Sequence, residues 1–254
     1  EENNIKTKVV GVDISIESTT YAMVDVRGNI MAEDSFPTED YPDVNNFVTT
    51  LSEKIVMMVE QNGGYETIRS IGVSCPSAST VSGCIENAAN LPWKGIVPLS
   101  AMLRDRIGLA VGLSNDAHIS ALGEHTFVSA HGMKDFVIVS LGVGIGSCFF
   151  SDGHEHCGHG GYAGEFGHTC VYPDGRQCGC GNKGCIEAYV GAKGIIQTAQ
   201  EMMAASDAPS LMRTLEKLSP RTIKECCDQG DEMAIEVYRR TGRILGQGLA
   251  TYAS

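Results

Sequence analysis

The sequence of 254 residues has no long apolar run and no cluster of positive charge. No apolar stretch approaches the ~20 residues needed to span a bilayer, and the polar start "EENNIKTK" is unlike a signal peptide. Lysine and arginine number 19 against 31 acidic residues, so the net charge of -12 would repel a nucleic-acid backbone. We therefore expect a soluble, cytoplasmic protein that binds neither nucleic acid nor a membrane.

Cysteine is abundant, but its distribution does not indicate a disulfide framework. With 254 residues and 43% hydrophobic content, the chain can bury a core without covalent cross-links. One segment, "GHTCVYPDGRQCGCGNKGCIE", has the spacing of metal ligands. It supplies one imidazole and three thiolates, a complete tetrahedral set for structural Zn²⁺: His168, Cys178, Cys180 and Cys185. The alternative is a thiol-rich loop without a metal.

Hydrophobic periodicity in the first half predicts a mixed sheet with helical crossovers. Apolar, β-branched runs indicate strands, and apolar residues at helical spacing indicate helices. The resulting order is βββαβαβα, with strands at 8–15, 19–26, 30–37, 68–75 and 109–116 and helices at 42–62, 99–108 and 117–127.

The second half begins again with strand, turn and strand, at 135–142 and 144–153. A glycine- and cysteine-rich excursion follows, and then helices are predicted at 191–205, 210–218, 221–229 and 231–254. We therefore expect two α/β domains, residues 1–117 and 118–254. The last helix presents Ile244, Leu245 and Leu249 at its apolar face, and its abrupt end suggests that the second domain is truncated.

The cysteine segment carries a resemblance to a known family. "GEFGHTCVYPDGRQCGCGNKGCIE" resembles the signature of the ROK family of repressors and sugar kinases, and "GVDIS", "NLPW", "SNDAHISALGE" and "LGVGIGSCFF" occur in that family's order. The resemblance implies an actin-like ATPase (ribonuclease H-like) fold, in which two α/β domains flank a cleft. It also implies a homodimer that uses ATP with Mg²⁺ to phosphorylate a hexose at its 6-hydroxyl, with glucokinase as the first expectation.

A candidate catalytic base follows a buried strand. Asp116 comes directly after an apolar run, at the end of a strand where α/β proteins bind ligands, and its carboxylate could accept the proton of a sugar hydroxyl. The resemblance assigns Asp116 this role and gives sugar hydroxyls to Asn115. The alternative is that the Asn-Asp pair only caps the helix that follows.

The resemblance assigns further sugar contacts to Asn90, Glu165, His168 and Glu187. His168 would bind zinc through one ring nitrogen and offer the other to the sugar, so that the zinc loop braces the sugar pocket. For Asn90 the alternative is a loop turn. For Glu187 it is a carboxylate at the first turn of a helix.

Two segments are expected to form the phosphate side of the site. Three glycines, Gly142, Gly144 and Gly146, would let backbone amides approach phosphate. The resemblance places Asp13 near the magnesium-bound phosphates and Ser15 in the phosphate loop.

The departure comes directly after Asp13. Where the family has two glycines and a threonine, this chain has Ser15, Ile16 and Glu17. A carboxylate beside phosphate is repelled unless it turns outward or binds magnesium. The sequence therefore leaves two hypotheses open beside glucokinase: a kinase for N-acetylmannosamine or N-acetylglucosamine, and a sugar-binding sensor that has lost phosphoryl transfer. A DNA-binding repressor is disfavoured by the charge.

Overall fold

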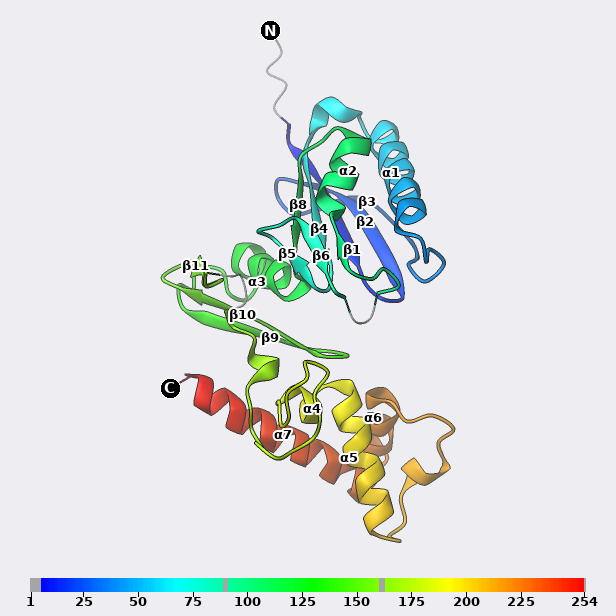
Figure 1. Cartoon of the computed structure of the whole chain (residues 1–254), viewed down its shortest axis with the longest axis vertical. Helices are drawn as coiled ribbons and strands as arrows, with labels where there is room; N and C mark the ends of the chain where they lie inside the picture. The colour runs from blue at the N-terminus through cyan, green and yellow to red at the C-terminus, as the bar shows by residue number, and fades with distance from the viewer. Residues whose placement is uncertain (1–5, 89–90, 160–162, 254) are drawn as a thin grey trace. The chain divides into compact units, whose positions relative to one another are not determined.

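The computed structural model describes residues 6–88, 91–159 and 163–253 (Figure 1). The chain forms two compact units, Glu1–Met133 and Lys134–Ser254. Helix α3 (Asp116–Phe127) belongs to the first unit by its contacts. The predicted domain boundary at 117/118 stays a prediction. Within the described residues, no helix combines the length and the apolar character that a membrane crossing requires.

The first unit contains a five-stranded mixed sheet, in the order β3-β2-β1-β4-β8. Strand β1 pairs antiparallel with β2 and parallel with β4, and β4 pairs parallel with β8. This confirms the predicted strands, although the last is shorter than expected. Their bounds are β1 (Lys8–Ile14), β2 (Ser18–Asp25), β3 (Ile30–Pro37), β4 (Ile68–Ser74) and β8 (Val111–Ser114). The sequence did not indicate a small second sheet of β5 (Ala78–Ser79), β6 (Cys84–Glu86) and β7 (Ile96–Val97).

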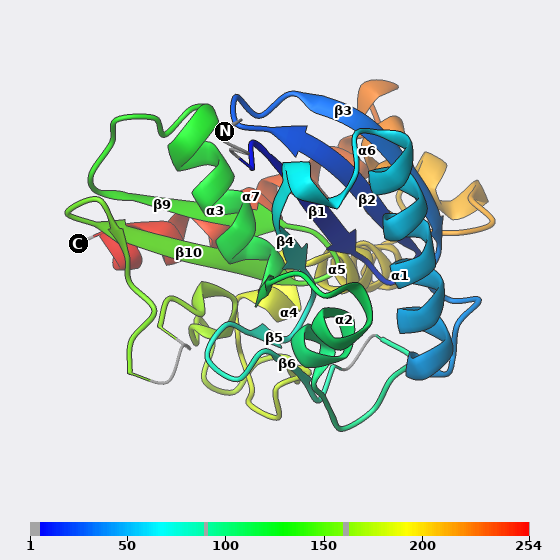
Figure 2. The ribbon, with the colours of Figure 1, turned by 90° about the horizontal axis from the view of Figure 1, so that it is seen from above.

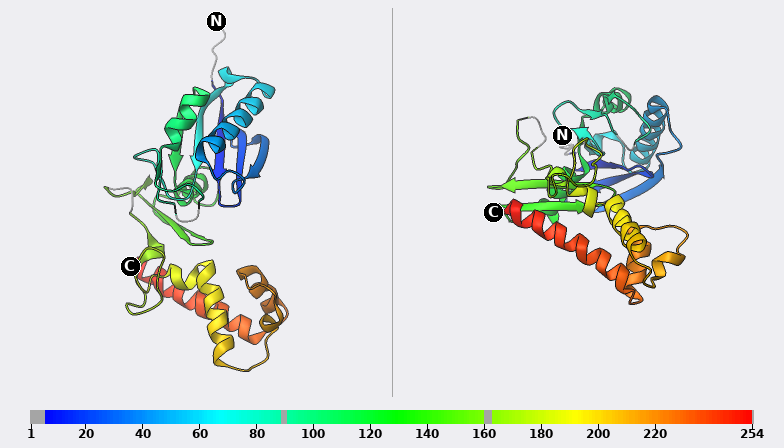
Figure 3. Two further views of the ribbon diagram at one scale, coloured as in Figure 1. Left: turned by 45° about the vertical axis from the view of Figure 1, so that its right-hand side comes forward. Right: turned by 60° about the horizontal axis from the view of Figure 1, so that its bottom comes forward.

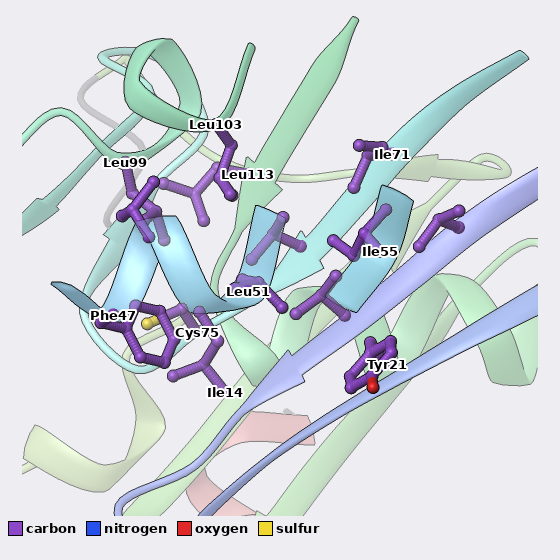
Figure 4. Close-up of a cluster of buried hydrophobic side chains, with 14 of the residues drawn as sticks. Ile14, Tyr21, Phe47, Leu51, Ile55, Ile71, Cys75, Leu99, Leu103 and Leu113 are labelled. Atoms are coloured by element: carbon purple, nitrogen blue, oxygen red, sulfur yellow. The ribbon is translucent and has the colours of Figure 1, made fainter. Parts of the chain in front are cut away.

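One apolar core fills the space between this sheet and two helices, α1 (Val44–Gln61) and α2 (Leu99–Ile107). Asp43 caps α1 by accepting a hydrogen bond from the Asn46 amide at 2.9 Å. The helical periodicity then directs Phe47 and Leu51, both fully buried, toward the sheet (Figure 4). The core therefore fixes α1 on the sheet whose strand ends carry the candidate catalytic residues.

The second unit starts with a three-stranded meander of β9 (Phe136–Leu141), β10 (Ile145–Ser151) and β11 (His154–Glu155). Strands β9 and β10 pair antiparallel and lie side by side in Figure 2, which confirms the predicted strand, turn and strand. The remaining helices are α4 (Glu187–Val190), α5 (Ala192–Ala205), α6 (Pro220–Asp228) and α7 (Glu232–Ala253). Helix α7, coloured red in Figure 3, contacts both α4 and α5.

The apolar face of α7 has a partner in this unit. Its residues Ile244, Leu245 and Leu249 pack against a buried cluster that lies outside the helix. That cluster consists of Ile145, Phe166, Ile186 and Val190. The approach is close at Gly248, where a Cβ atom would overlap the side chain of Ile186 and lie 3.1 Å from that of Phe166. A glycine on α7 thus seats the helix directly on the turn that carries His168.

The prediction of a helix at 210–218 is wrong. Only a 3₁₀ turn forms there, at Leu211–Thr214. The carboxylate of Asp231 accepts hydrogen bonds from the Ser210 hydroxyl at 2.7 Å and from the Leu211 amide at 2.6 Å. These tertiary bonds hold the backbone in a turn and override the helical propensity of the segment.

Candidate functional site

Two predicted acidic residues lie at one edge of the first unit's sheet. Asp13, the next-to-last residue of β1, pairs with Ser74 of β4, and Ser74 pairs with Ser114, which Asp116 follows by two residues. Burial raises the pKa of the Cys75 thiol at this edge, and the charges of Asp116 and Asp13 raise it further. Both carboxylates are therefore within electrostatic reach of one thiol. Both are exposed to solvent.

Asn115 and Asp116 also cap α3. The amide of Ala117 donates to Asn115 Oδ1 at 2.8 Å and to Asp116 Oδ1 at 2.9 Å. Capping and catalysis do not exclude one another, because a carboxylate has a second oxygen that can accept a proton. The catalytic role of Asp116 and the sugar contact of Asn115 stay predictions, and Asn90 lies outside the described residues.

The segment that departs from the family is the tight turn between β1 and β2. The Ser15 hydroxyl donates to the Ser18 carbonyl at 2.8 Å, and the Ser18 amide donates back to Ser15 Oγ at 3.1 Å. The turn therefore already uses the hydroxyl that was expected to face phosphate. Glu17 lies at the tip, where its side chain is exposed and its carbonyl accepts a bond from the Thr38 amide at 3.1 Å.

The four proposed zinc ligands of the second unit converge on one point. The ligand atoms of His168, Cys178, Cys180 and Cys185 all lie within 4.8 Å of one another. Cys178 Sγ is 3.7 Å from His168 Nδ1, and Cys180 Sγ is 3.7 Å from Cys185 Sγ. Three sulfurs and one imidazole nitrogen are a donor set that zinc prefers, so the residues fit the predicted metal.

The electrostatics of the cluster differ from one thiol to the next. Burial raises the pKa of Cys185 to about 12 and also raises that of Cys178. The pKa of Cys180 is lowered, chiefly by a hydrogen bond from the Asn182 backbone. Binding of a divalent cation requires that all three thiols lose their protons. Metal binding would therefore change the charge of two buried groups.

Glu187 joins this cluster to the glycine-rich turn after β9. One carboxylate oxygen, Oε2, accepts a hydrogen bond from the Ile145 amide at 2.8 Å, and Oε1 is 4.0 Å from Cys178 Sγ. A Cβ atom at Gly144 would come within 2.5 Å of Oε2. Gly144 is thus a glycine because a carboxylate occupies its side-chain space, a reason that the sequence did not reveal.

The glycines at 142–146 form a turn that is braced on α5. The Gly142 amide donates to the Gly144 carbonyl at 2.9 Å, and the Gly142 carbonyl accepts a bond from the Ala192 amide at 3.0 Å. Gly146 lies within β10, where it pairs with Ser140. In this conformation the Gly142 amide is engaged inside the turn, so the phosphate contacts assigned to Gly142, Gly144 and Gly146 stay predictions.

Glu165 and His168 lie at the two ends of a 3₁₀ turn, Phe166–His168. Phe166 is fully buried and anchors the turn, and its amide donates to Ser147 Oγ at 2.9 Å. Glu165 is exposed. His168 directs Nδ1 toward Cys178, so Nε2 lies on the opposite side of the ring. The arrangement matches a histidine that serves a metal with one nitrogen and a ligand with the other.

The sequence also matches a family model described as the ROK family, over residues 9–254. The chain belongs to the ROK family. It is 30% identical over 254 residues to a glucokinase of Streptomyces coelicolor, an alignment that covers 96% of this chain and 77% of the relative.

Two further matches are a repressor and a glucokinase of known structure. A xylose repressor of Caldicellulosiruptor bescii is 25% identical over 248 residues, covering 95% of this chain and 61% of the relative. The crystal structure of a ROK family glucokinase from Streptomyces griseus, in complex with glucose and AMPPNP, is similar with a TM-score of 0.78 and 28% identity. That likeness covers 97% of this chain and 79% of the other. It confirms the predicted α/β fold of the actin-like ATPase type with its mixed sheets.

Proposed function

We propose that this chain transfers the γ-phosphoryl group of ATP to the 6-hydroxyl of a hexose, with glucose as its first substrate. Membership of the ROK family and the likeness to glucokinases make the chain an ATP-dependent sugar phosphotransferase. The observation that carries the finer proposal is the exposed Asp116 carboxylate, which lies at the same edge of the sheet as Asp13. A homodimer stays a prediction of the resemblance.

Phosphoryl transfer assigns distinct roles to these two acids. Asp116 accepts the proton of the sugar hydroxyl while the oxygen of that hydroxyl bonds to the γ-phosphorus. At the same time, the bond between the γ-phosphorus and the bridging oxygen of the β-phosphate breaks. ADP leaves with that oxygen. Asp13 would hold the magnesium ion that accompanies ATP, which would neutralise charge on the phosphates, and Asn115 orients sugar hydroxyls.

In the second unit, Glu165, His168 and Glu187 are assigned to sugar hydroxyls. Zinc held by His168 and the three cysteines would supply rigidity, because the position open to a substrate in catalytic zinc sites is filled here by protein. His168 Nδ1 would face the ion, which fixes the tautomer and presents Nε2 as a donor. The support for this role is the convergence of the four ligand atoms within 4.8 Å.

The proposal is tested by an assay coupled to ADP release, run with glucose, N-acetylmannosamine and N-acetylglucosamine. We expect glucose to give the highest kcat/KM. Asp116→Asn should lower kcat by about a thousandfold, because a general base acts in the transition state. The Kd for glucose should stay within about tenfold, because the amide keeps the shape of the carboxylate.

Asp105→Asn is the matched control, since Asp105 is an exposed acid of the same unit that pairs with Arg104 on α2. It should leave kcat and the Kd for glucose unchanged. An Asp116→Asn variant that keeps most of its turnover would contradict the proposal. So would one that loses its fold together with its activity, because that result assigns Asp116 to capping alone.

A second candidate, a sugar sensor without transferase activity, is favoured by Glu17. Within ~5 Å of a phosphate charge, at an effective dielectric constant of about 20, its carboxylate would cost roughly 3 kcal/mol. That free energy corresponds to about a hundredfold in rate. The exposed side chain of Glu17 and the hydrogen bonds that close the turn beneath it support an outward orientation.

Glu17→Thr separates the two functions. With Glu17 turned outward, the substitution should change kcat and the apparent KM for ATP by less than about twofold, since an exposed charge is screened. Glu39→Thr, which removes another exposed acid of this unit, controls for net charge. A gain of tenfold or more in Glu17→Thr alone would identify an impaired phosphate site and favour the sensor. A comparable loss would give Glu17 a role in binding magnesium and also overturn the outward orientation.

A further inference from the structure

Arg176 lies in the loop that carries Cys178, Cys180 and Cys185, residues 169–186, called the cysteine loop below. Its side chain contacts two helices. One guanidinium nitrogen, Nη1, donates to the carbonyl of Ala188 in α4 at 3.2 Å and to that of Gly194 in α5 at 3.0 Å. Another, Nη2, donates to Thr198 Oγ1 at 3.0 Å and to Glu201 Oε2 at 2.6 Å. One planar cation thus joins the loop, α4 and α5.

The surroundings of Arg176 hold this guanidinium in place. It stacks over the ring of Tyr189, with its central carbon 4.7 Å from the ring centroid, and its side chain is only 13% exposed. The Tyr189 hydroxyl in turn accepts a hydrogen bond from the Arg176 amide at 2.8 Å. Partial burial alone would raise the pKa of Glu201, but hydrogen bonds from Arg176 and Gln197 lower it. Glu201 therefore faces Arg176 as a carboxylate.

The backbone of Arg176 also holds the cysteine loop closed. Its carbonyl accepts a hydrogen bond from the Gly184 amide at 2.8 Å, next to the pairing of Gln177 with Lys183. Gly184 has a φ of 73° and lies against the Tyr172 carbonyl, so a side chain would not fit there. These bonds fix the hairpin that carries Cys178 and Cys185.

We propose that Arg176 is a positioning residue for the sugar site, which rests on the function proposed above. Helix α4 begins at Glu187, and Ala188, whose carbonyl Arg176 binds, is the next residue. Arg176 therefore fixes the start of α4 against the cysteine loop. That fixes the carboxylate of Glu187 between the Ile145 amide and Cys178. Arg176 acts on the sugar through Glu187.

The test compares Arg176→Lys and Arg176→Gln with the purified wild-type protein. Lysine keeps the charge but cannot reproduce a fork of several fixed donors, so both variants should show the effect. We expect amide hydrogen exchange at Ile145 and at 188–191 to become about tenfold faster, because the local opening of α4 becomes easier. The KM for the sugar should rise about tenfold with kcat within about threefold, the pattern of lost ground-state binding.

Arg213 provides a matched control in the same unit. Its guanidinium also donates to backbone carbonyls, those of Ala208 and Met203 at 3.1 Å each, but it is not bonded to the cysteine loop. Arg213→Gln should leave the KM and the exchange at 188–191 unchanged. The metal content, measured by elemental analysis, should match the wild type in all variants.

Three results would overturn the positioning role. The first is unchanged exchange at 188–191 in Arg176→Gln, and the second is an equal rise of KM in Arg213→Gln. The third is loss of metal from Arg176→Lys, which would assign the effect to the cluster itself. If the wild type phosphorylates no hexose, the proposed function fails. The exchange data still decide whether Arg176 fixes α4.

Discussion

The two units begin with the same meander of three strands but are stabilised in different ways. In the first, one contiguous apolar core extends from the sheet to α1 and α2. In the second, the apolar residues divide into two smaller clusters, one beside α6 and one under α7. In the second unit, three charged side chains also connect the elements. Arg176, Glu187 and Asp231 each bind backbone groups of other segments.

This difference predicts in which unit the loss of one polar side chain should reduce stability most. A large apolar core spreads its stabilisation over many side chains, so the loss of one polar group leaves most of it intact. A unit tied by a few directed hydrogen bonds loses a complete connection when one donor or acceptor is removed. The candidate sugar contacts of the second unit depend on such connections, whereas Asp13 and Asp116 are carried by strands and a helix of the unit with the continuous core.

Removal of the proposed zinc should give the largest effect, and it should destabilise the second unit while leaving the first unit folded. Structural zinc contributes about 10 kcal/mol or more in small zinc domains, so Cys185→Ser should open the second unit. We expect hydrogen exchange to increase greatly at 168–190 and sugar turnover to be lost. Exchange in β1 and β4 should stay slow.

Cys226→Ser is the matched control, because Cys226 is equally buried but lies in the cluster beside α6 rather than among the ligands. It should retain a full equivalent of metal and most of the turnover. If Cys185→Ser keeps its metal, or if β1 and β4 open together with 168–190, the contrast between the units is wrong.

The sequence predicted the periodic part of this molecule well. Strands β1, β2, β3, β9 and β10 and helix α1 follow from apolar spacing, which is a local property. The ligand set of the cysteine loop follows from spacing too, because chelating residues must lie close in the chain or be brought together by a tight turn. The end of a buried strand indicated Asp116, the family resemblance supplied Asp13, and both lie at one edge of the sheet.

The remaining features depend on tertiary contacts that no local pattern encodes. The bond between Glu187 and the Ile145 amide joins residues 42 positions apart, and that between Arg176 and Glu201 joins residues 25 apart. The segment 210–218 has helical propensity, yet Asp231 holds its start as a turn. Acidic or basic side chains at such positions look like ordinary surface residues until their partners are known.

Substitution of Asp231 should give the smallest effect, but it tests the comparison between the units most specifically. Its side chain is 8% exposed and accepts bonds from the Ser210 hydroxyl and from the amides of Leu211, Met233 and Ala234. Burial alone would raise its pKa, but these hydrogen bonds outweigh burial and hold the pKa below its ordinary value. The charged form is therefore favoured in the folded state.

Because the folded pKa is lowered, the stabilisation is complete above the unfolded pKa of about 4 and is lost as the pH falls through the folded value. Asp231→Asn should destabilise the second unit by about 1–3 kcal/mol at pH 7, measured from hydrogen exchange in α6 and α7. The difference from wild type should shrink below pH ~4. Asp228→Asn removes an exposed partner of Lys224 and should leave the free energy of unfolding nearly unchanged, because an exposed ion pair contributes little. An equal loss in both variants, or a loss that persists unchanged at low pH, would mean that this unit does not depend on the Asp231 carboxylate.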